Sequence, residues 1–164
     1  PRARPVGPLW CGRIPPDPEP RMKTTHVRSS DVEERWLVFD ASEHQLGRMA
    51  TRIAMALMGK DRPSWTPNQL TGAHVVVVNS KAVRLSGKKP TTKIYPHYTR
   101  YSGGLKDVSL AEVQARRPND VVTLAVRRML PKTRLGHRML ARLKVYPDAE
   151  HPHEAQRPVK VEPT

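Results

Sequence analysis

Residues 36–59, WLVFDASEHQLGRMATRIAMALMG, predict the unit on which the fold is built. The stretch opens with a short apolar run that ends at Asp40, a pattern typical of a buried strand. From residue 46 onward, apolar side chains recur at helical spacing and share one face. These side chains are Leu46, Ala50, Ile53, Ala54 and Leu57. Gly59 follows as a suitable C-terminal stop. The stretch therefore predicts a strand, a turn and a helix.

Residues 75–78 are consecutive valines and predict a second strand. A strand that is apolar on both faces is typical of a parallel sheet covered by helices. We therefore expect an α/β domain in which a central sheet lies between layers of helices.

Two further helices are predicted after this strand. Ser109 and Glu112 have the spacing of a capping box, which indicates a helix that runs to about residue 116. Pro118 suits the first turn of the next helix. The apolar stripe of that helix would be Val122, Ala125 and Met129, and Pro131 would end it.

The composition indicates a polyanionic partner. The chain has 164 residues, a formal net charge of +14 and a pI of about 10.6. A nucleic acid fits this balance better than a membrane does, because no stretch approaches the roughly 20 apolar residues of a spanning helix. Cys11 is the only cysteine, so neither a disulfide framework nor a thiolate metal site is expected.

Residues 121–147 form the strongest candidate for a nucleic-acid surface, because they hold many cations and no acid. Their basic residues are Arg127, Arg128, Lys132, Arg134, Arg138, Arg142 and Lys144. Over residues 134–143 the sequence predicts a helix with two faces, one carrying an arginine row and the other Leu135, Met139 and Leu143. Like charges four apart on a helix repel by roughly 0.2–0.5 kcal/mol per pair. A bound polyanion would offset this repulsion; the alternative is a merely solvated helix face.

A second candidate surface spans residues 88–106, within the acid-free window 62–106. Basic and aromatic side chains alternate there, and such groups can reach phosphates and stack on unpaired bases. The candidates are Lys88, Lys89, Lys93, Tyr95, His97, Tyr98, Arg100 and Lys106. The alternative is an ordinary strand whose tyrosines pack against the domain.

Motifs typical of enzymes are not found. Residues 103–106, GGLK, lack the leading glycine and the Lys-Ser/Thr pair of a P-loop, and no G-x-G-x-x-G follows either strand. His151 and His153 could bind a cation, but an isolated H-P-H is weak evidence for zinc. No catalytic triad or pair of carboxylates stands out. We expect no catalytic residues, no metal and no cofactor.

The sequence resembles the uL13 family of large-subunit ribosomal proteins, bacterial type. The signature lies in residues 126–131, VRRMLP, followed by Gly136 and by residues 143–146, LKVY. Further similarity lies at residues 36–51 and 93–106, and the resemblance covers roughly residues 22–158. It implies a three-layer α/β/α domain around a four-stranded, largely parallel sheet. It also implies a structural protein that binds large-subunit rRNA and acts in early assembly, with neighbouring large-subunit proteins as partners. Arg48, in the helix of the first unit, is included among the expected RNA-binding residues.

We expect three segments. Residues 1–21 are rich in proline and lack an apolar period, which predicts disorder. Residues 22–147 would form one RNA-binding domain, and residues 148–164 an irregular tail. Bacterial-type ribosomes would place the protein in the cytoplasm; an organellar ribosome is less favoured, because the first segment lacks serine and carries Asp17 and Glu19. The competing hypothesis is a nucleotide-dependent enzyme with its site at the carboxyl edge of the sheet.

Overall fold

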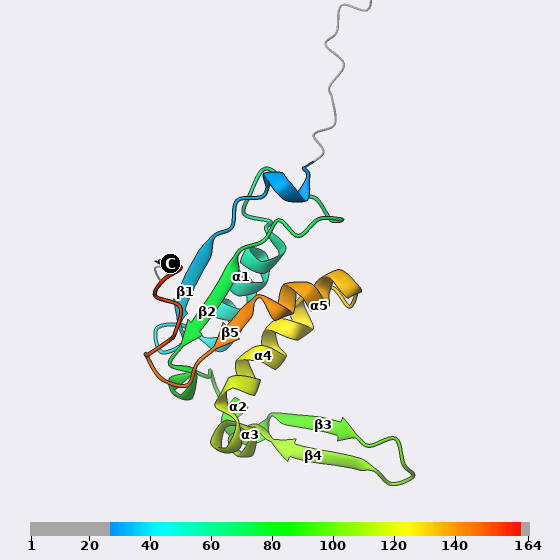
Figure 1. Cartoon of the computed structure of the whole chain (residues 1–164). Coiled ribbons are helices and arrows are strands. Elements are labelled where there is room, and N and C mark those ends of the chain that lie inside the picture. The colour runs from blue at the N-terminus through cyan, green and yellow to red at the C-terminus, as the bar shows by residue number, and fades with distance from the viewer. Residues whose placement is uncertain (1–26, 162–164) are drawn as a thin grey trace, which may run out of the picture.

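The computed structural model describes residues 27–161, and the segment expected to be disordered lies outside them. A four-stranded sheet in the order β5-β2-β1-β6 forms the centre of the fold (Figure 1). The strands are β1 (Trp36–Asp40), β2 (His74–Val78), β5 (Leu143–Val145) and β6 (Val159–Lys160). All pairings within this sheet are parallel. The α/β class and the four-stranded, largely parallel sheet are thus confirmed.

The predicted strand-turn-helix unit is present as β1 and α1 (Leu46–Met58). All five residues of the predicted apolar face of α1 are buried. Gly59 has φ +77° and its N–H donates to the carbonyl of Ala56, which ends the helix as expected. A helix between two strands supplies the crossover that parallel pairing requires. β1 and β2 accordingly pair in register, from Trp36 opposite His74 onward.

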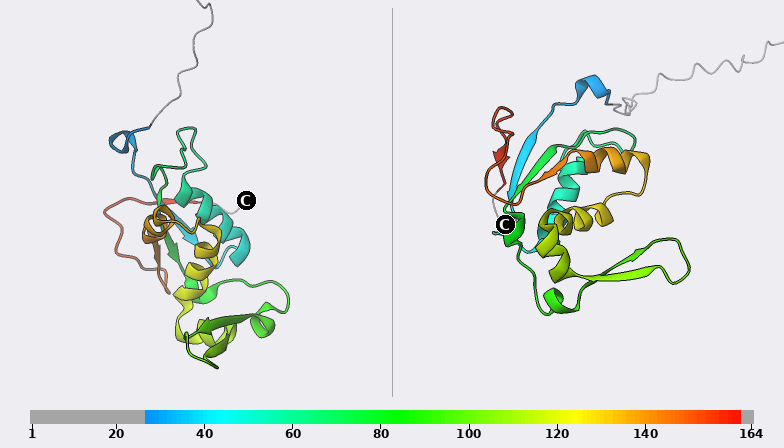
Figure 2. Two further views of the ribbon diagram at one scale, coloured as in Figure 1. Left: turned by 90° about the vertical axis from the view of Figure 1, so that its right-hand side faces the viewer. Right: turned by 60° about the horizontal axis from the view of Figure 1, so that its bottom comes forward.

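The core lies between the sheet and three helices. These are α1, α4 (Pro118–Met129) and α5 (Arg134–Ala141), which lie on one side of the sheet in Figure 2. Phe39, Val75 and Val77 share a single buried cluster with side chains of all three helices. Burial of each such side chain contributes about 1.5–3 kcal/mol. On the other side of the sheet, the C-terminal segment places His153 against Trp36, with ring centroids 5.2 Å apart.

The helix signals before α4 are confirmed, but part of its apolar stripe is wrong. Ser109 caps α3 (Leu110–Arg116) by accepting a hydrogen bond from the N–H of Glu112. Pro118 is the first residue of α4. The buried residues of α4 are Val121, Val122 and Val126, whereas Met129 is exposed. Met129 lies in the last turn of α4, where its sulfur is 3.7 Å from Thr51 Oγ1 of α1, while the residue remains 42% exposed.

The arginine-row helix is shorter than predicted. α5 ends at Ala141, and Leu143 belongs to strand β5. Met139 and Leu143 are both buried as expected, and Leu135 is partly buried. The apolar spacing therefore continued across a helix-to-strand boundary, because both elements bury side chains in the same core.

A separate two-stranded hairpin projects from the body of the molecule (Figures 1 and 2). Its strands are β3 (Ile94–Tyr98) and β4 (Leu105–Ser109), and the short helix α2 (Lys89–Thr92) precedes it. At the tip, Thr99 N–H donates to Gly104 O at 3.0 Å and Gly104 N–H donates to Tyr101 O at 2.9 Å. The candidate window 88–106 is thus mainly a projecting antiparallel hairpin.

The segment from 148 onward was expected to be irregular, and the structure corrects this at its end. β6 pairs with β1, placing Val159 opposite Leu37 and Lys160 opposite Val38. Lys160 also reaches Glu43, with Nζ 2.9 Å from Oε1. A strand of two residues is too short to show a period in the sequence, so only its tertiary pairing reveals it. The remaining short elements are η1 (Ser29–Asp31) and η2 (Ser80–Ala82).

Candidate nucleic-acid interface

The first cluster of cations lines a groove between α4 and α5, the α4–α5 groove. It has a volume of about 360 Å³, its cations are Arg127, Arg128 and Lys132, and His137 also lines it. Thr133 caps α5 by accepting from the N–H of Gly136 at 3.2 Å. A Cβ on Gly136 would lie 1.8 Å from the carbonyl oxygen of Pro131, so only glycine permits this close approach. The turn that ends α4 and the start of α5 therefore hold the cations of the groove together.

A second groove, the α1–α2 groove, adjoins the first. Its volume is about 640 Å³, and it collects residues from α1, from the segment before α2, from α2 and from α4. The cations lining it are Arg48, Arg84, Lys89, Lys93 and Arg128. Leu46 N–H donates to Arg84 O at 3.0 Å, which fixes Arg84 at the start of α1.

Arg128 lines both grooves, so the two join into one surface. We call this surface the basic band; its members are Arg48, Arg84, Lys89, Lys93, Arg127, Arg128 and Lys132. No Asp or Glu lines either groove, and within residues 27–161 no ion pair involves a member of the band. Uncompensated cations gathered in this way raise the local concentration of anions. The band is thus a candidate anion-binding surface, built from α1, α2 and α4 and from three connecting segments that carry Arg84, Lys93 and Lys132.

Tyr95 is buried beside two members of the band. Its side chain is only 8% exposed, so its ring cannot stack on a base as expected from the sequence. The ring instead contacts two cations, with Lys93 Nζ at 5.2 Å and the Arg128 guanidinium at 5.6 Å from its centroid. Such cation–π contacts are worth about 0.5–1 kcal/mol at exposed sites. Tyr95 therefore positions Arg128 and Lys93 and does not itself face the solvent.

The hairpin divides the other predicted residues between two faces. Successive residues of a strand point to opposite faces, and residues paired across strands share a face. His97 pairs with Lys106 and lies on the face of Tyr95, which contacts the band. Tyr98 pairs with Leu105 and lies on the opposite face. Arg100, with φ +71°, lies at the tip. The structure therefore brings His97 and Lys106 to the band side and turns Tyr98 away.

The arginine row is also divided. Arg134 and Arg138 are exposed on α5, although they line neither groove, and Lys88 is likewise exposed just before α2. Arg142 follows the end of α5, and its Nη1 donates to the carbonyl of Gly72 at 2.6 Å. Arg142 is thus engaged within the fold, which corrects its placement in the exposed row. The helical period that aligned the three arginines stops where α5 stops.

Lys144 lies on the far side of the sheet from the helices. It is opposite Val76 in the β2–β5 register, while its neighbour Leu143 belongs to the helix-side core. Burial lowers the pKa of His74 below its ordinary value, and the positive charges of Arg142 and Lys144 lower this pKa further. Lys144 therefore contributes to a different surface from the band.

Two residues that line the grooves, Arg84 and His137, were not predicted from the sequence. Arg84 is inside the acid-free window 62–106, so that window was the available signal. His137 lies on α5 among the arginines. Neither residue has a local pattern that distinguishes it from an ordinary polar residue on the surface.

Comparison with known proteins identifies the family. The family described as Ribosomal protein L13 matches residues 34–152. The chain belongs to the ribosomal protein L13 family. This match includes α1 to α5, the hairpin and both grooves, and it confirms the resemblance noted from the sequence.

Relatives from several bacteria agree with this family membership. Proteins named large ribosomal subunit protein uL13 match from Thermotoga petrophila, at 49% identity over 143 residues, 87% of this chain and 96% of the relative. The Thermus thermophilus protein of that name is 52% identical over 131 residues, 80% of this chain and 94% of the relative. The Aquifex aeolicus protein is 47% identical over 141 residues, 86% and 98% respectively.

The carboxyl edge of the sheet offers little support for the enzyme hypothesis, in agreement with membership of the L13 family. Asp40, at the end of β1, accepts hydrogen bonds from Ser42 N–H at 2.9 Å, Ser42 Oγ at 2.7 Å and Asn79 Nδ2 at 3.1 Å. Burial raises the pKa of Asp40, but these hydrogen bonds outweigh burial and hold it below the ordinary value. Asp40 is thus a charged structural acceptor rather than a proton carrier.

Residues 27–161 contain no group of three or more His, Cys, Asp or Glu side chains that could hold a metal ion. No helix among them has the length and apolar character needed to cross a membrane.

Proposed function

We propose that this protein is a structural, non-catalytic constituent of the large ribosomal subunit and binds large-subunit rRNA through the basic band. The observation that carries the proposal is the joining of two grooves by Arg128, with seven cations and no acid along them. The names of the bacterial relatives support the same assignment. We expect neighbouring large-subunit proteins to be further partners, and the cytoplasm of a bacterial cell to be the location.

Binding would rest on neutralising RNA phosphates. Arg48, Arg127 and Arg128 can each present two parallel N–H donors to one phosphate, whereas lysines act as point charges. His97 and Lys106 extend the band along the inner face of the hairpin. Lys88, Arg100, Arg134 and Arg138 are exposed outside the grooves and would add further contacts. Release of condensed counterions from the RNA then supplies much of the binding free energy.

The breadth of the surface supports the proposal of a role in early subunit assembly. Band residues come from α1, α2, α4 and three connecting segments, and the inner face of the hairpin lies beside them. RNA segments that are far apart in sequence repel each other, and a cationic surface of this extent would lower that repulsion. Binding would therefore favour a compact arrangement of the RNA before later proteins join.

The test is a salt titration of the complex between the full-length protein and large-subunit rRNA. The variant Arg127→Gln with Arg128→Gln should bind more weakly, and its plot of log affinity against log salt should be shallower by about two counterions. A matched control is Lys81→Gln with Arg116→Gln. It removes the same charge from residues that already pair with Asp148 and Glu112, away from the grooves.

The expected result is that the control keeps the salt slope of the unaltered protein. Equal slopes for the band variant and the control would show that net charge alone drives binding, and would contradict the placement of the interface. Saturable binding of a free nucleotide, without cosedimentation with ribosomes at high salt, would favour the enzyme hypothesis instead.

A further inference from the structure

The outer face of the hairpin, which points away from the band, is apolar and uncovered. Ile94, Tyr98 and Leu105 are 52%, 58% and 61% exposed, and all three share this face with Pro96. Figures 1 and 2 show the hairpin projecting from the body of the molecule, with no other element alongside its free end. Contiguous exposed apolar side chains of this size mark interaction sites more often than single exposed residues do.

The hairpin is held in a defined conformation without a covering layer. Its tip is closed by hydrogen bonds between Thr99, Tyr101 and Gly104. A Cβ on Gly104 would lie 2.1 Å from Thr99 Oγ1, so the turn is tightly packed. Isolated two-stranded hairpins are marginally stable in water, because they bury little apolar surface. A partner seated on the outer face would supply the missing burial.

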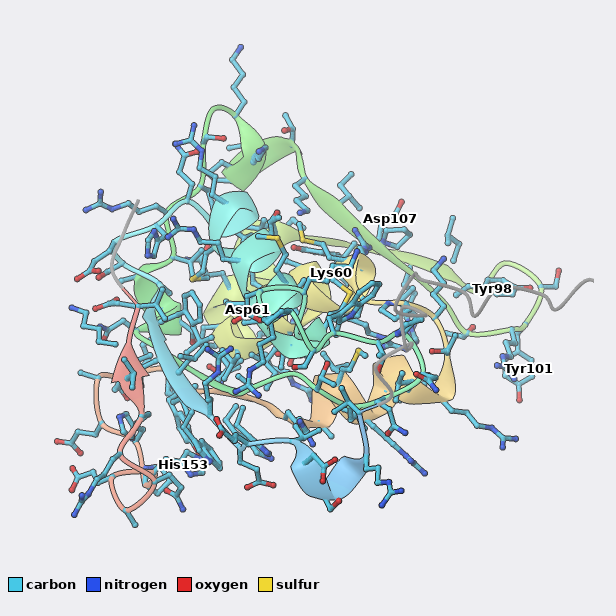
Figure 3. The ribbon with its side chains drawn as sticks, turned by 90° about the horizontal axis from the view of Figure 1, so that it is seen from above. Lys60, Asp61, Tyr98, Tyr101, Asp107 and His153 are labelled. Atoms are coloured by element: carbon cyan, nitrogen blue, oxygen red, sulfur yellow. The ribbon has the colours of Figure 1, made fainter. Side chains whose placement is uncertain are left out.

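The charge on the outer face differs in sign from that of the band. Asp107 is opposite Pro96 at the middle of this face. It is the first acidic residue after the acid-free window 62–106. No described ion pair involves it. Figure 3 shows Asp107 nearer the body of the molecule, with Tyr98 and Tyr101 toward the tip. The strand residues of this face include no Lys, Arg or His, whereas the inner face has His97 and Lys106.

We propose that the outer face of the hairpin docks another protein, through a segment with apolar side chains and a Lys or Arg that pairs with Asp107. A phosphate backbone would meet a carboxylate there and no strand cation, so RNA fits this face poorly. Because successive side chains of β3 point to opposite faces, His97 would contact RNA and Tyr98 would contact the protein partner. The inference rests on the proposed function and deepens it, since it assigns a protein partner to the face opposite the RNA.

Photo-crosslinking from adjacent residues tests this assignment. A benzoylphenylalanine would replace Tyr98 in one full-length variant and His97 in another, and each would be irradiated in purified large subunits. From position 98 the expected product is a crosslink to a protein segment that contains apolar residues and a Lys or Arg. From position 97 the expected product is a crosslink to rRNA.

A charge-reversal variant provides a second test, which concerns the pairing of Asp107 with a cation of the partner. Asp107→Lys should reduce the protein crosslink from position 98 by about threefold to tenfold. The control Glu150→Lys, at an exposed acid in the C-terminal segment, should leave it unchanged. A crosslink from 98 mainly to RNA, no crosslink from 98 in assembled subunits, or indifference to Asp107→Lys would each overturn the inference. Failure of the RNA crosslink from 97 would instead count against the proposed function, and a chain that does not join the subunit would overturn both.

Discussion

Asp40 shows how a single side chain joins the two central strands at their carboxyl ends. Its carboxylate accepts hydrogen bonds from Ser42 in the following turn and from Asn79 after β2. Asn79 has φ +59°, an uncommon conformation for a residue with a Cβ, and this contact helps to hold it. The loop after β2 therefore depends on a charge at the end of β1.

Replacing Asp40 with Asn should destabilise the protein at neutral pH and remove part of its acid sensitivity. The pKa of Asp40 is lowered in the folded state from an ordinary value of 3.8, so its contribution is present above pH 3.8 and is lost as pH falls below it. Hydrogen bonds to a charged group are worth about 1.5–3 kcal/mol, which sets the scale of the loss at pH 7. Urea unfolding at pH 7 and at pH 3 measures it.

The control for this experiment is Asp31→Asn, at an exposed acid in η1. That variant should follow the unaltered protein at both pH values. If Asp40→Asn and the unaltered protein lost the same free energy of unfolding between pH 7 and pH 3, the carboxylate would not carry the interaction described.

At the scale of the element, α5 separates binding from folding. Replacing Arg134 and Arg138 with Gln should weaken rRNA binding and reduce the salt slope by up to two counterions. The free protein should keep its stability or gain a few tenths of a kcal/mol, because like charges four apart repel. In contrast, Met139→Ala should cost roughly 2–5 kcal/mol, since that side chain is buried in the core. Filter binding and urea unfolding provide the two readouts.

Arg142 should behave differently from Arg134 and Arg138 in the same unfolding experiment. Its bond to the Gly72 carbonyl ties the end of α5 to the segment before β2, so Arg142→Gln should lower the free energy of unfolding by about 1–3 kcal/mol. Unchanged stability for this variant would show that Arg142 does not stabilise the fold and should be grouped with the exposed Arg134 and Arg138. Loss of folding in the Arg134 and Arg138 double variant would show that those arginines are structural.

At the scale of the whole molecule, the two ends of the chain should behave differently when removed. Deleting residues 1–21 should change the melting temperature by less than a few degrees and leave rRNA binding nearly unchanged, because residues 27–161 include a complete core cluster. Deleting residues 159–164 should lower the melting temperature more, because it removes β6 and the Lys160–Glu43 ion pair. Scanning calorimetry measures both. A larger drop for the first deletion would mean that residues 1–21 pack on the domain.

Much of the fold could be predicted because its signals are local. The apolar face of α1, the Gly59 cap, the Ser109 cap and the valine strand each depend on side chains a few residues apart. Helical and strand periods report these relations directly. The basic character of the protein could likewise be predicted from its composition alone. The family signature in residues 126–146 then indicated the partner that composition alone left as any polyanion.

The sequence by itself determined the strand-helix-strand unit, the helix caps, the basic character and the family. Only the tertiary structure decided which cations meet. Arg48 and Arg128 are 80 positions apart in the numbering, yet they line one groove because α1 packs against α4. The hairpin places the buried Tyr95 beside Arg128 of α4, and Arg142 leaves the arginine row because α5 ends before it. Periodicity describes the faces of one element, whereas a binding surface arises from the packing of several elements, which no local pattern encodes.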